Sequence, residues 1–292
     1  ELGQYPVTNT IRYPKAGETN PTLKIGILRV EGAGRKWVEN AYVTDDYLPW
    51  MEWVNNEKIA FLKLDRKQKN WDMYVANRKT GKSIKVLSES DENGWLDNHG
   101  QIYFLKDGKI VWISEKSGFK HIWMAKHSGS KTWAITEGDW EVSEIKFIDE
   151  VNNRIYFTAN KESVLEMRFY SIRFDGTDLK LLTKETGSHK IQILGSKKYF
   201  IDTYSSISIP KIISLNNLED GSIVKILDET DISQFNEYKW STPELIRFPT
   251  NDSLEILDGM IVFPINYDQN KRYPVIVHGY GMPGTQMIWN RW

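Results

Sequence analysis

The feature that most constrains the fold is a unit of strands and turns that recurs from Trp50 onward with a period of about 45–50 residues. Each copy opens with a segment rich in aromatic and β-branched residues. These opening segments are Lys58–Leu62, Gln101–Leu105, Arg154–Thr158 and Lys198–Asp202. A period of this length is typical of propeller blades, whose sheets bury their faces only against neighbouring copies.

The rest of each copy keeps the same order. A second strand-like segment follows the first, at Trp71–Val75, Lys120–Met124, Met167–Ser171 and Pro210–Ser214. Next comes a glycine, at Gly81, Gly129, Gly176 and Gly221, where a hairpin turn requires positive φ. A short apolar run closes the copy. We therefore predict a mainly β fold: a partial propeller of about four to five blades, each a four-stranded antiparallel sheet. The repeat units are roughly 48–90, 91–137, 138–186 and 187–240. The alternative, a β-sandwich, leaves the preserved order of strand, turn and strand to accident.

Composition excludes several classes of function. The formal net charge is −1 over 292 residues, which argues against a nucleic-acid or membrane-surface binder. The chain has no cysteine, so a disulfide, a cysteine nucleophile and a cysteine metal site are all excluded. No apolar run approaches the ~18 residues of a transmembrane helix. We expect no metal and no cofactor.

From about Ser241 the repeat ends and a different pattern begins. Leu245–Phe248 and Leu254–Phe263 predict a hairpin pair, with Asp258 and Gly259 as its candidate turn. Pro274–Val277 then predicts a strand buried on both faces. We expect 1–240 to form the propeller part and 241–292 to begin an α/β-hydrolase domain that is cut before its nucleophile, since the chain contains no Gly-x-Ser-x-Gly.

The predicted buried strand runs into a Gly-rich turn that carries His278 and Tyr280. An α/β-hydrolase builds half of its oxyanion hole from such a turn. Tyr280 is therefore the candidate oxyanion donor, against the simpler interpretation of a tyrosine packed at a strand end. His278 precedes any nucleophile, whereas the hydrolase histidine follows it in the chain, so a turn-stabilising role is favoured for His278.

The other histidines and one pair of carboxylates are weaker candidates for a catalytic or metal-binding role. Four histidines without metal-ligand spacing are predicted to be structural: His99, His121, His127 and His189. Glu141 and Glu144 lie three residues apart on an expected strand, where alternation puts them on opposite faces. Shared acid–base chemistry between them is not expected.

Four stretches, in order along the chain, resemble the dipeptidyl peptidase IV family of serine peptidases, part of the prolyl oligopeptidase superfamily. The most specific is Tyr13-Pro-Lys-Ala-Gly17 with Asn20-Pro21. Ser117-Gly-Phe-Lys-His121 is similar to the family's acid-Gly-aromatic-basic-His segment, with serine in place of the acid, and Thr136–Val142 is similar to its Gly-x-Trp-Glu-Val segment. Tyr273-Pro274 with Tyr280 and Pro283 resembles the first hydrolase strand and its tyrosine-containing turn.

The resemblance implies an eight-bladed propeller that caps an α/β-hydrolase domain. It also implies a Ser-Asp-His triad, a tyrosine hydroxyl in the oxyanion hole and a glutamate pair that holds the substrate's free amine. Of these groups only the tyrosine has a matching position here, Tyr280. The glutamate pair is expected upstream of Glu1, and the triad beyond Trp292. Met282 stands where the family commonly has a glycine before the proline, which alters the turn.

The function expected from this resemblance is the release of N-terminal Xaa-Pro or Xaa-Ala dipeptides from peptides, with the propeller gating access. The chain alone is expected to be inactive. Two alternatives stay open: a propeller that binds peptides without catalysis, and an oligopeptidase or acylaminoacyl peptidase of the same superfamily. The intact enzyme is expected to be a homodimer with a peptide substrate, periplasmic or secreted, with no nucleic-acid partner and no membrane span in this chain.

Overall fold

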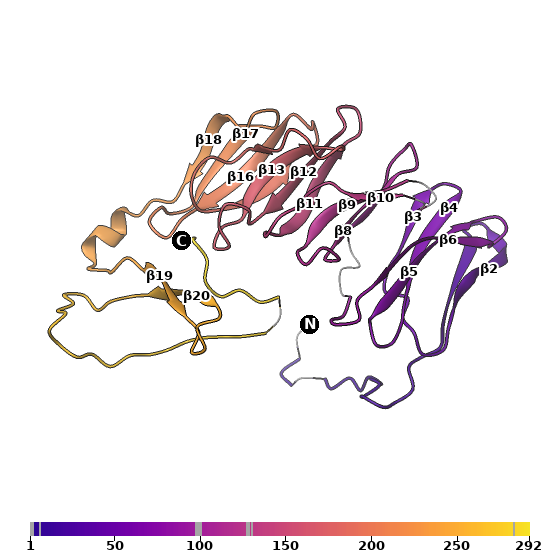
Figure 1. The fold of residues 1–292 in the computed structure, drawn as a ribbon, viewed down its shortest axis with the longest axis horizontal. Helices are drawn as coiled ribbons and strands as arrows, with labels where there is room; N and C mark the ends of the chain where they lie inside the picture. Colours follow the sequence, from indigo (N-terminus) through magenta and orange to yellow (C-terminus); the bar gives the residue numbers. More distant parts are fainter. Residues whose placement is uncertain (1–2, 6, 97–100, 127–128, 130, 283) are drawn as a thin grey trace. The chain divides into compact units, whose positions relative to one another are not determined.

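The computed structural model describes residues 3–5, 7–96, 101–126, 129, 131–282 and 284–292. Across these ranges the chain is built from strands and turns, with a single short 3₁₀-helix, η1 (Ser233–Glu237), and no α-helix (Figure 1). Nothing helical in the described part is long and apolar enough to span a bilayer. The predicted mainly β fold class, a partial propeller of four-stranded sheets, is confirmed.

The chain divides into two compact units. The first comprises Glu1–Val111 with Ala125–Thr132, and the second comprises Trp112–Met124 with Trp133–Trp292. The strands of one four-stranded sheet, β7 (Ile102–Phe104), β8 (Ile110–Ser114), β9 (His121–Ala125) and β10 (Thr132–Ala134), are shared between the two units.

The first unit contains a hairpin and a complete four-stranded sheet. The hairpin pairs β1 (Leu23–Arg29) with β2 (Gly32–Val43). The sheet is a meander of four antiparallel strands: β3 (Met51–Asn55), β4 (Lys58–Leu64), β5 (Asn70–Asn77) and β6 (Ser83–Ser90). Its core includes the fully buried Phe61, which stacks on Tyr74 with ring centroids 5.3 Å apart.

The second unit contains two further meanders of the same kind. One consists of β11 (Val142–Asp149), β12 (Arg154–Ala159), β13 (Arg168–Arg173) and β14 (Lys180–Leu181). The other consists of β15 (Ser188–Ile193), β16 (Tyr199–Ser205), β17 (Ile212–Asn217) and β18 (Ile223–Glu229). Phe169 of the former packs edge-on against Phe200 of the latter, with ring centroids 5.0 Å apart. Apolar side chains thus fill the space between successive sheets, as expected of blades.

The predicted turn glycines have a second role at the contact between successive sheets. All four adopt positive φ, at 77°, 66°, 81° and 75° for Gly81, Gly129, Gly176 and Gly221. Each also faces a backbone carbonyl of the preceding strand layer. A Cβ at these positions would lie 2.3 Å from Trp37 O, 1.5 Å from Val86 O, 3.2 Å from Ile135 O and 1.9 Å from Leu182 O, in that order. The turn therefore needs glycine for its conformation and for the close approach of two backbones.

Sequence patterning identified three strands in each repeat and missed one. The repeat pattern did not mark β3, β8, β11 and β15, although a strand was expected around Glu141 and Glu144, where β11 lies. In the second repeat the segment at Gln101–Leu105 corresponds to β7, the first strand of its sheet, whereas the equivalent segments of the other repeats correspond to second strands. Strand β3 is almost entirely exposed, so it lacks the apolar alternation on which the prediction depends.

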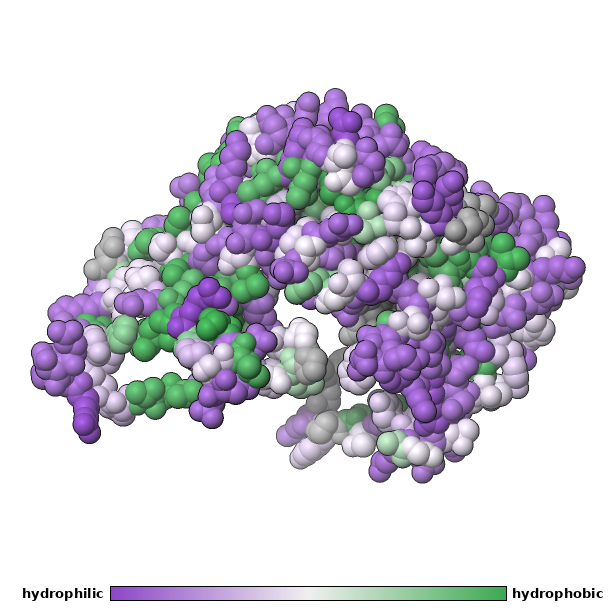
Figure 2. All heavy atoms as spheres, viewed as in Figure 1, coloured by the Kyte–Doolittle hydropathy of each residue, from purple (hydrophilic) through white to green (hydrophobic). Residues whose placement is uncertain are grey.

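The hairpin predicted after Ser241 is present, but its predicted turn is wrong. β19 (Glu244–Pro249) pairs with β20 (Ile256–Ile261), and Asp258 and Gly259 lie within β20, opposite Arg247 and Ile246. The turn lies at Thr250–Ser253, where Ser253 N–H donates to Thr250 O and Ser253 has φ 58°. Hydrophobic side chains reach the surface in this part of the chain (Figure 2).

The prediction of a buried strand at Pro274–Val277 is also wrong for this chain. The segment carries no assigned strand, and Val275, Ile276 and Val277 are 79%, 97% and 89% exposed. A strand buried on both faces needs a hydrogen-bonding neighbour on each side. Among the described residues, no strand of the chain pairs with this one.

Replacement of Gly221 by alanine tests the turn geometry. We expect Gly221→Ala to lower the free energy of unfolding by at least about 1–2 kcal/mol, because alanine disfavours positive φ and its Cβ would meet Leu182 O. The measurement is a urea unfolding curve. Gly195→Ala is the matched control, since a Cβ there meets nothing within 4 Å. Equal unfolding midpoints for the two variants would contradict the role assigned to Gly221.

Candidate functional site

Tyr280 lies at the surface, in a segment without assigned secondary structure. Its side chain is 56% exposed, and its hydroxyl donates to Met282 Sδ at 2.7 Å. His278 is exposed as well, and no ring contact or hydrogen bond places it against Tyr280. Pro283, which belongs to the same family-like turn, lies outside the described residues. The tyrosine side chain is therefore accessible from solvent.

A buried hydrogen-bonded cluster holds the chain a few residues after Tyr280. Asn290 is buried, and its Nδ2 donates to Glu166 Oε1 at 2.8 Å while its Oδ1 accepts from Ile207 N–H at 3.0 Å. Asn290 N–H donates to Leu165 O at 2.8 Å. One side chain and its backbone thus bond to the loop before β13 and to the loop after β16. In Figure 1 the C-terminus returns beside these strands.

Two further bonds extend this contact in both directions along the chain. Gln286 Nε2 donates to Val164 O at 2.7 Å, and Trp292 N–H donates to Ser205 Oγ at 3.2 Å. The segment 286–292 is consequently bonded at its start, near its end and at its last residue to the third sheet (β11–β14) and the fourth sheet (β15–β18) or their loops. All of these residues belong to the second unit. We call this segment the strap.

The carboxylate that receives the strap is itself fixed by a buried arginine. Glu166 and Arg168 are 5% and 6% exposed, and Arg168 Nη1 lies 3.7 Å from Glu166 Oε2. Arg168 Nη2 donates to Thr183 O at 2.9 Å and to Glu185 O at 2.8 Å. A buried carboxylate is tolerated only when it is paired and hydrogen-bonded, and Glu166 has both kinds of partner.

His189 continues the cluster between the third and fourth sheets. Its Nε2 lies 3.0 Å from Glu185 O, and its Nδ1 lies 2.7 Å from Asp202 Oδ2. The carbonyl can only accept, so Nε2 carries a proton. The ring stacks on Tyr204 at 4.8 Å, and burial raises the pKa of the Tyr204 phenol, which donates to Thr186 O. The prediction of a structural histidine is confirmed for His189, with a carboxylate partner that the spacing did not reveal.

His121 begins β9, the third strand of the second four-stranded sheet, as Arg168 begins the third strand of the next sheet. Its Nε2 donates to Gly138 O at 2.8 Å, and its Nδ1 lies 3.0 Å from Thr136 Oγ1, which also accepts from Ile122 N–H at 2.9 Å. The Trp140 ring packs edge-on against it at 4.9 Å. His121 thereby joins two of the family-like segments, and the structural role predicted for it is confirmed. His99 and His127 lie outside the described residues.

The two candidate carboxylates do not form a pair. Glu141 and Glu144 are both exposed, and a β-bulge between Val142 and Glu144 breaks the alternation of β11. Glu144 pairs instead with Lys146. In the described part of the chain no group of three or more histidine and carboxylate side chains is arranged to hold a metal ion.

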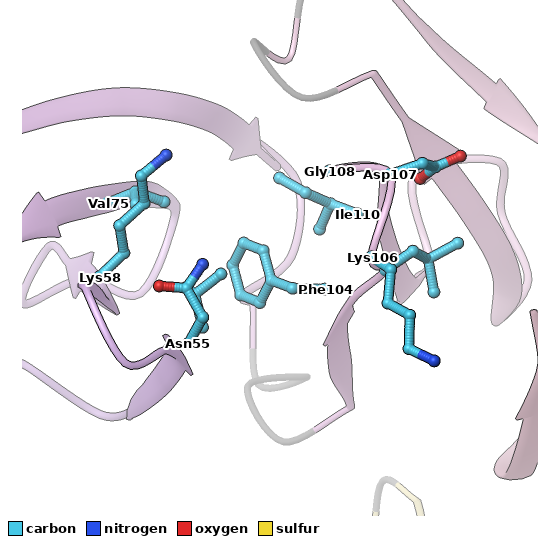
Figure 3. Close-up of a pocket in the computed structure, with 10 residues that line it drawn as sticks. Asn55, Lys58, Val75, Phe104, Lys106, Asp107, Gly108 and Ile110 are labelled. Carbon is cyan, nitrogen blue, oxygen red and sulfur yellow. The ribbon is translucent and has the colours of Figure 1, made fainter.

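A cavity of about 560 Å³ lies in the first unit (Figure 3). It is lined by residues of β3, β4 and β5 and by the turn between β7 and β8. In Figure 3 the Phe104 ring lies between Asn55 and that turn. The polar lining groups are Asn55, Lys58, Lys106 and Asp107. Among the described residues that line it there is no histidine and no hydroxyl group.

Comparison with known proteins identifies the family. The family model described as the dipeptidyl peptidase IV (DPP IV) N-terminal region matches residues 1–211. The chain belongs to the dipeptidyl peptidase IV family. It is 27% identical over 305 residues to a dipeptidyl peptidase 4 of Trichophyton equinum and 28% identical over 309 residues to that of Arthroderma otae. Both alignments cover 99% of this chain and 39% of the relative.

The fold comparison agrees with the sequence comparison. The crystal structure of Porphyromonas gingivalis dipeptidyl peptidase 4 superposes with a TM-score of 0.90 at 26% identity, covering 99% of this chain and 41% of that one. The chain thus spans about two-fifths of the length of these family members. The resemblance stated from the four sequence stretches is confirmed.

Sequence reasoning missed the cluster around Asn290, Glu166 and Arg168. These residues are widely separated in the sequence, and none lies in a recognisable motif. The one available signal is the repeat itself: Arg168 and His121 each begin the third strand of their sheets, where a side chain bonds to the segment that follows the fourth strand.

The Thr136 hydroxyl provides a test of the His121 contact. Thr136→Val keeps the side-chain shape but leaves Ile122 N–H and His121 Nδ1 without this partner inside the protein. We expect the free energy of unfolding to fall by about 1–3 kcal/mol. Thr132→Val, on the exposed start of β10, is the control and should change stability little. The measurement is the urea midpoint, and an unchanged midpoint for Thr136→Val would show that the hydroxyl is dispensable.

Proposed function

We propose that this chain is the propeller part, with the first segment of the catalytic domain, of a serine peptidase that releases Xaa-Pro or Xaa-Ala dipeptides from peptide N-termini. The observation that carries the proposal is the family match over residues 1–211, supported by relatives named dipeptidyl peptidase 4 along the full chain. Residues 1–240 belong to the propeller and 241–292 to the start of the hydrolase domain. The substrate is a peptide, and the propeller admits short or unfolded chains to an enclosed site.

In the intact enzyme, Tyr280 is the residue of this chain that contributes directly to catalysis. Its hydroxyl donates a hydrogen bond to the oxyanion of the tetrahedral intermediate, while the nucleophile, its acid and its base come from outside this sequence. The donor is available for that role because its present acceptor, the Met282 sulfur, is a weak one. Reorientation toward an anionic oxygen replaces a weak hydrogen bond with a charge-assisted one.

Replacement of Tyr280 by phenylalanine in the full-length enzyme tests this assignment. Removal of one oxyanion donor typically lowers kcat by about 10²- to 10³-fold, and we expect Tyr280→Phe to fall in this range with little change in KM. The measurement is steady-state hydrolysis of a Gly-Pro chromogenic substrate. Tyr238→Phe, which changes an exposed tyrosine elsewhere, is the control and should retain activity. Retention of kcat by Tyr280→Phe would refute the role.

The 292-residue chain by itself is expected to be inactive toward the same substrate, because it holds no Gly-x-Ser-x-Gly nucleophile. The measurement is turnover by the purified chain after controls for contaminating peptidases. Turnover that copurifies with the chain would contradict the proposal. In the full-length enzyme, cleavage of Gly-Pro substrates only when their amine is acetylated would favour the acylaminoacyl alternative.

A further inference from the structure

The strap begins six residues after Tyr280, and its bond from Asn290 to Glu166 joins two buried side chains, whereas the bonds at its two ends are exposed. The central residue is Asn290, whose side chain joins Glu166 and Ile207 N–H. Upstream of Tyr280, the nearest packed group is the aromatic stack of Phe263, Tyr267 and Tyr273. The Gly-rich stretch that carries Tyr280 is therefore anchored on its downstream side by the strap, while the upstream stack is a contact among partly exposed rings of one loop.

We propose that Glu166 and Asn290 are positioning residues for Tyr280: the propeller places the oxyanion donor by anchoring the strap. This inference rests on the proposed function, because it takes the Tyr280 hydroxyl to be the donor. It assigns to the third and fourth sheets a part in catalysis beyond gating. Neither Glu166 nor Asn290 touches the substrate in this scheme.

The reason for an anchor is the composition of the stretch itself. Gly279, Gly281 and Gly284 give its backbone wide conformational freedom, and a Cβ at any of them would meet nothing within 4 Å. An oxyanion donor must be held within a fraction of an ångström of its working position, and a misplacement of about 1 Å can cost roughly 10² in rate. A buried bond close in sequence supplies the restraint that the glycines lack.

The charge on Glu166 explains why the anchor is stiff. A carboxylate accepts a stronger hydrogen bond from Asn290 than a neutral amide would. Arg168 holds the opposite oxygen of Glu166, and Arg168 is itself bonded to two backbone carbonyls of the segment after β14. The position of Asn290 is thereby fixed, through Glu166 and Arg168, by backbone carbonyls of the segment after β14.

The test uses the full-length enzyme with Asn290→Asp. The change is isosteric and keeps an acceptor for Ile207 N–H, but it sets a carboxylate 2.8 Å from Glu166 Oε1 in place of a donor. We expect kcat for a Gly-Pro chromogenic substrate to fall about 10- to 100-fold with little change in KM. Addition of Glu166→Gln restores a donor–acceptor pair, so the double variant should recover to within about threefold of wild type.

Two comparisons separate positioning from general destabilisation. Asn270→Asp is the matched control, because exposed Asn270 Nδ2 also donates to a carboxylate, Asp268, at 3.2 Å; it should leave kcat unchanged. In the Tyr280→Phe background, Asn290→Asp should lower kcat by less than about twofold, since the donor that it positions is already absent. All assays are run well below the melting temperature of each variant.

If Asn290→Asp does not fold, Gln286→Ala serves in its place. Gln286 is exposed, and its loss removes the bond to Val164 O without burying a charge. We expect a severalfold lower kcat at an unchanged melting temperature.

The inference is overturned if Asn290→Asp, or Gln286→Ala in its place, keeps kcat within twofold of wild type. It is also overturned if Glu166→Gln gives no recovery, or if the Asn290→Asp loss persists undiminished in Tyr280→Phe. Failure of the proposed function is distinguishable, because wild type would then show no dipeptide release, or Tyr280→Phe would be fully active.

Discussion

The contact on which the rest of the structure depends is a backbone-to-backbone approach at the turn between the third and fourth strands of each sheet. Gly221 faces Leu182 O, and Gly81 makes the same kind of contact with Trp37 O. Because no side chain intervenes, the spacing between successive sheets is set by main-chain atoms. Aromatic and aliphatic side chains then fill a gap of defined width. A side chain at the turn would separate the sheets before it disturbed their interiors.

A fixed spacing between sheets also allows a buried polar cluster to keep all of its hydrogen bonds. Arg168 and His189 come from different sheets and both bond to the carbonyl of Glu185. Such bonds hold only if the two sheets keep their separation, since a shift of half an ångström would leave buried charges without partners. The first position of the third strand is His121 in one repeat and Arg168 in another. Both side chains donate to a backbone carbonyl of the segment after the fourth strand, so the contact recurs although the residue type differs.

The part of the fold that could be predicted is the part specified by short-range sequence patterns. Turn glycines and apolar strand segments repeat at a constant interval, and they identified the sheets and the turns at Gly81 and Gly221. Strand β3 and the position of the hairpin turn at Thr250–Ser253 were missed, because exposure and side-chain capping decide them rather than hydrophobic period. The Gly-rich turn motif was enough to single out Tyr280 as a candidate. The Asn290–Glu166 bond had no such signal, since 124 residues separate its partners and neither lies in a strand of the repeat.

The failure of the Pro274–Val277 prediction has the same physical origin. Three β-branched residues specify an extended backbone, but burial requires neighbouring strands, which a local pattern cannot provide. The segment has no assigned secondary structure, and Ile276 is 97% exposed. What holds this end of the chain is therefore not a sheet but the strap that begins at Gln286. A propeller that anchors the strap acts as a template for the segment, and that mechanical link requires no contact with Tyr280 itself.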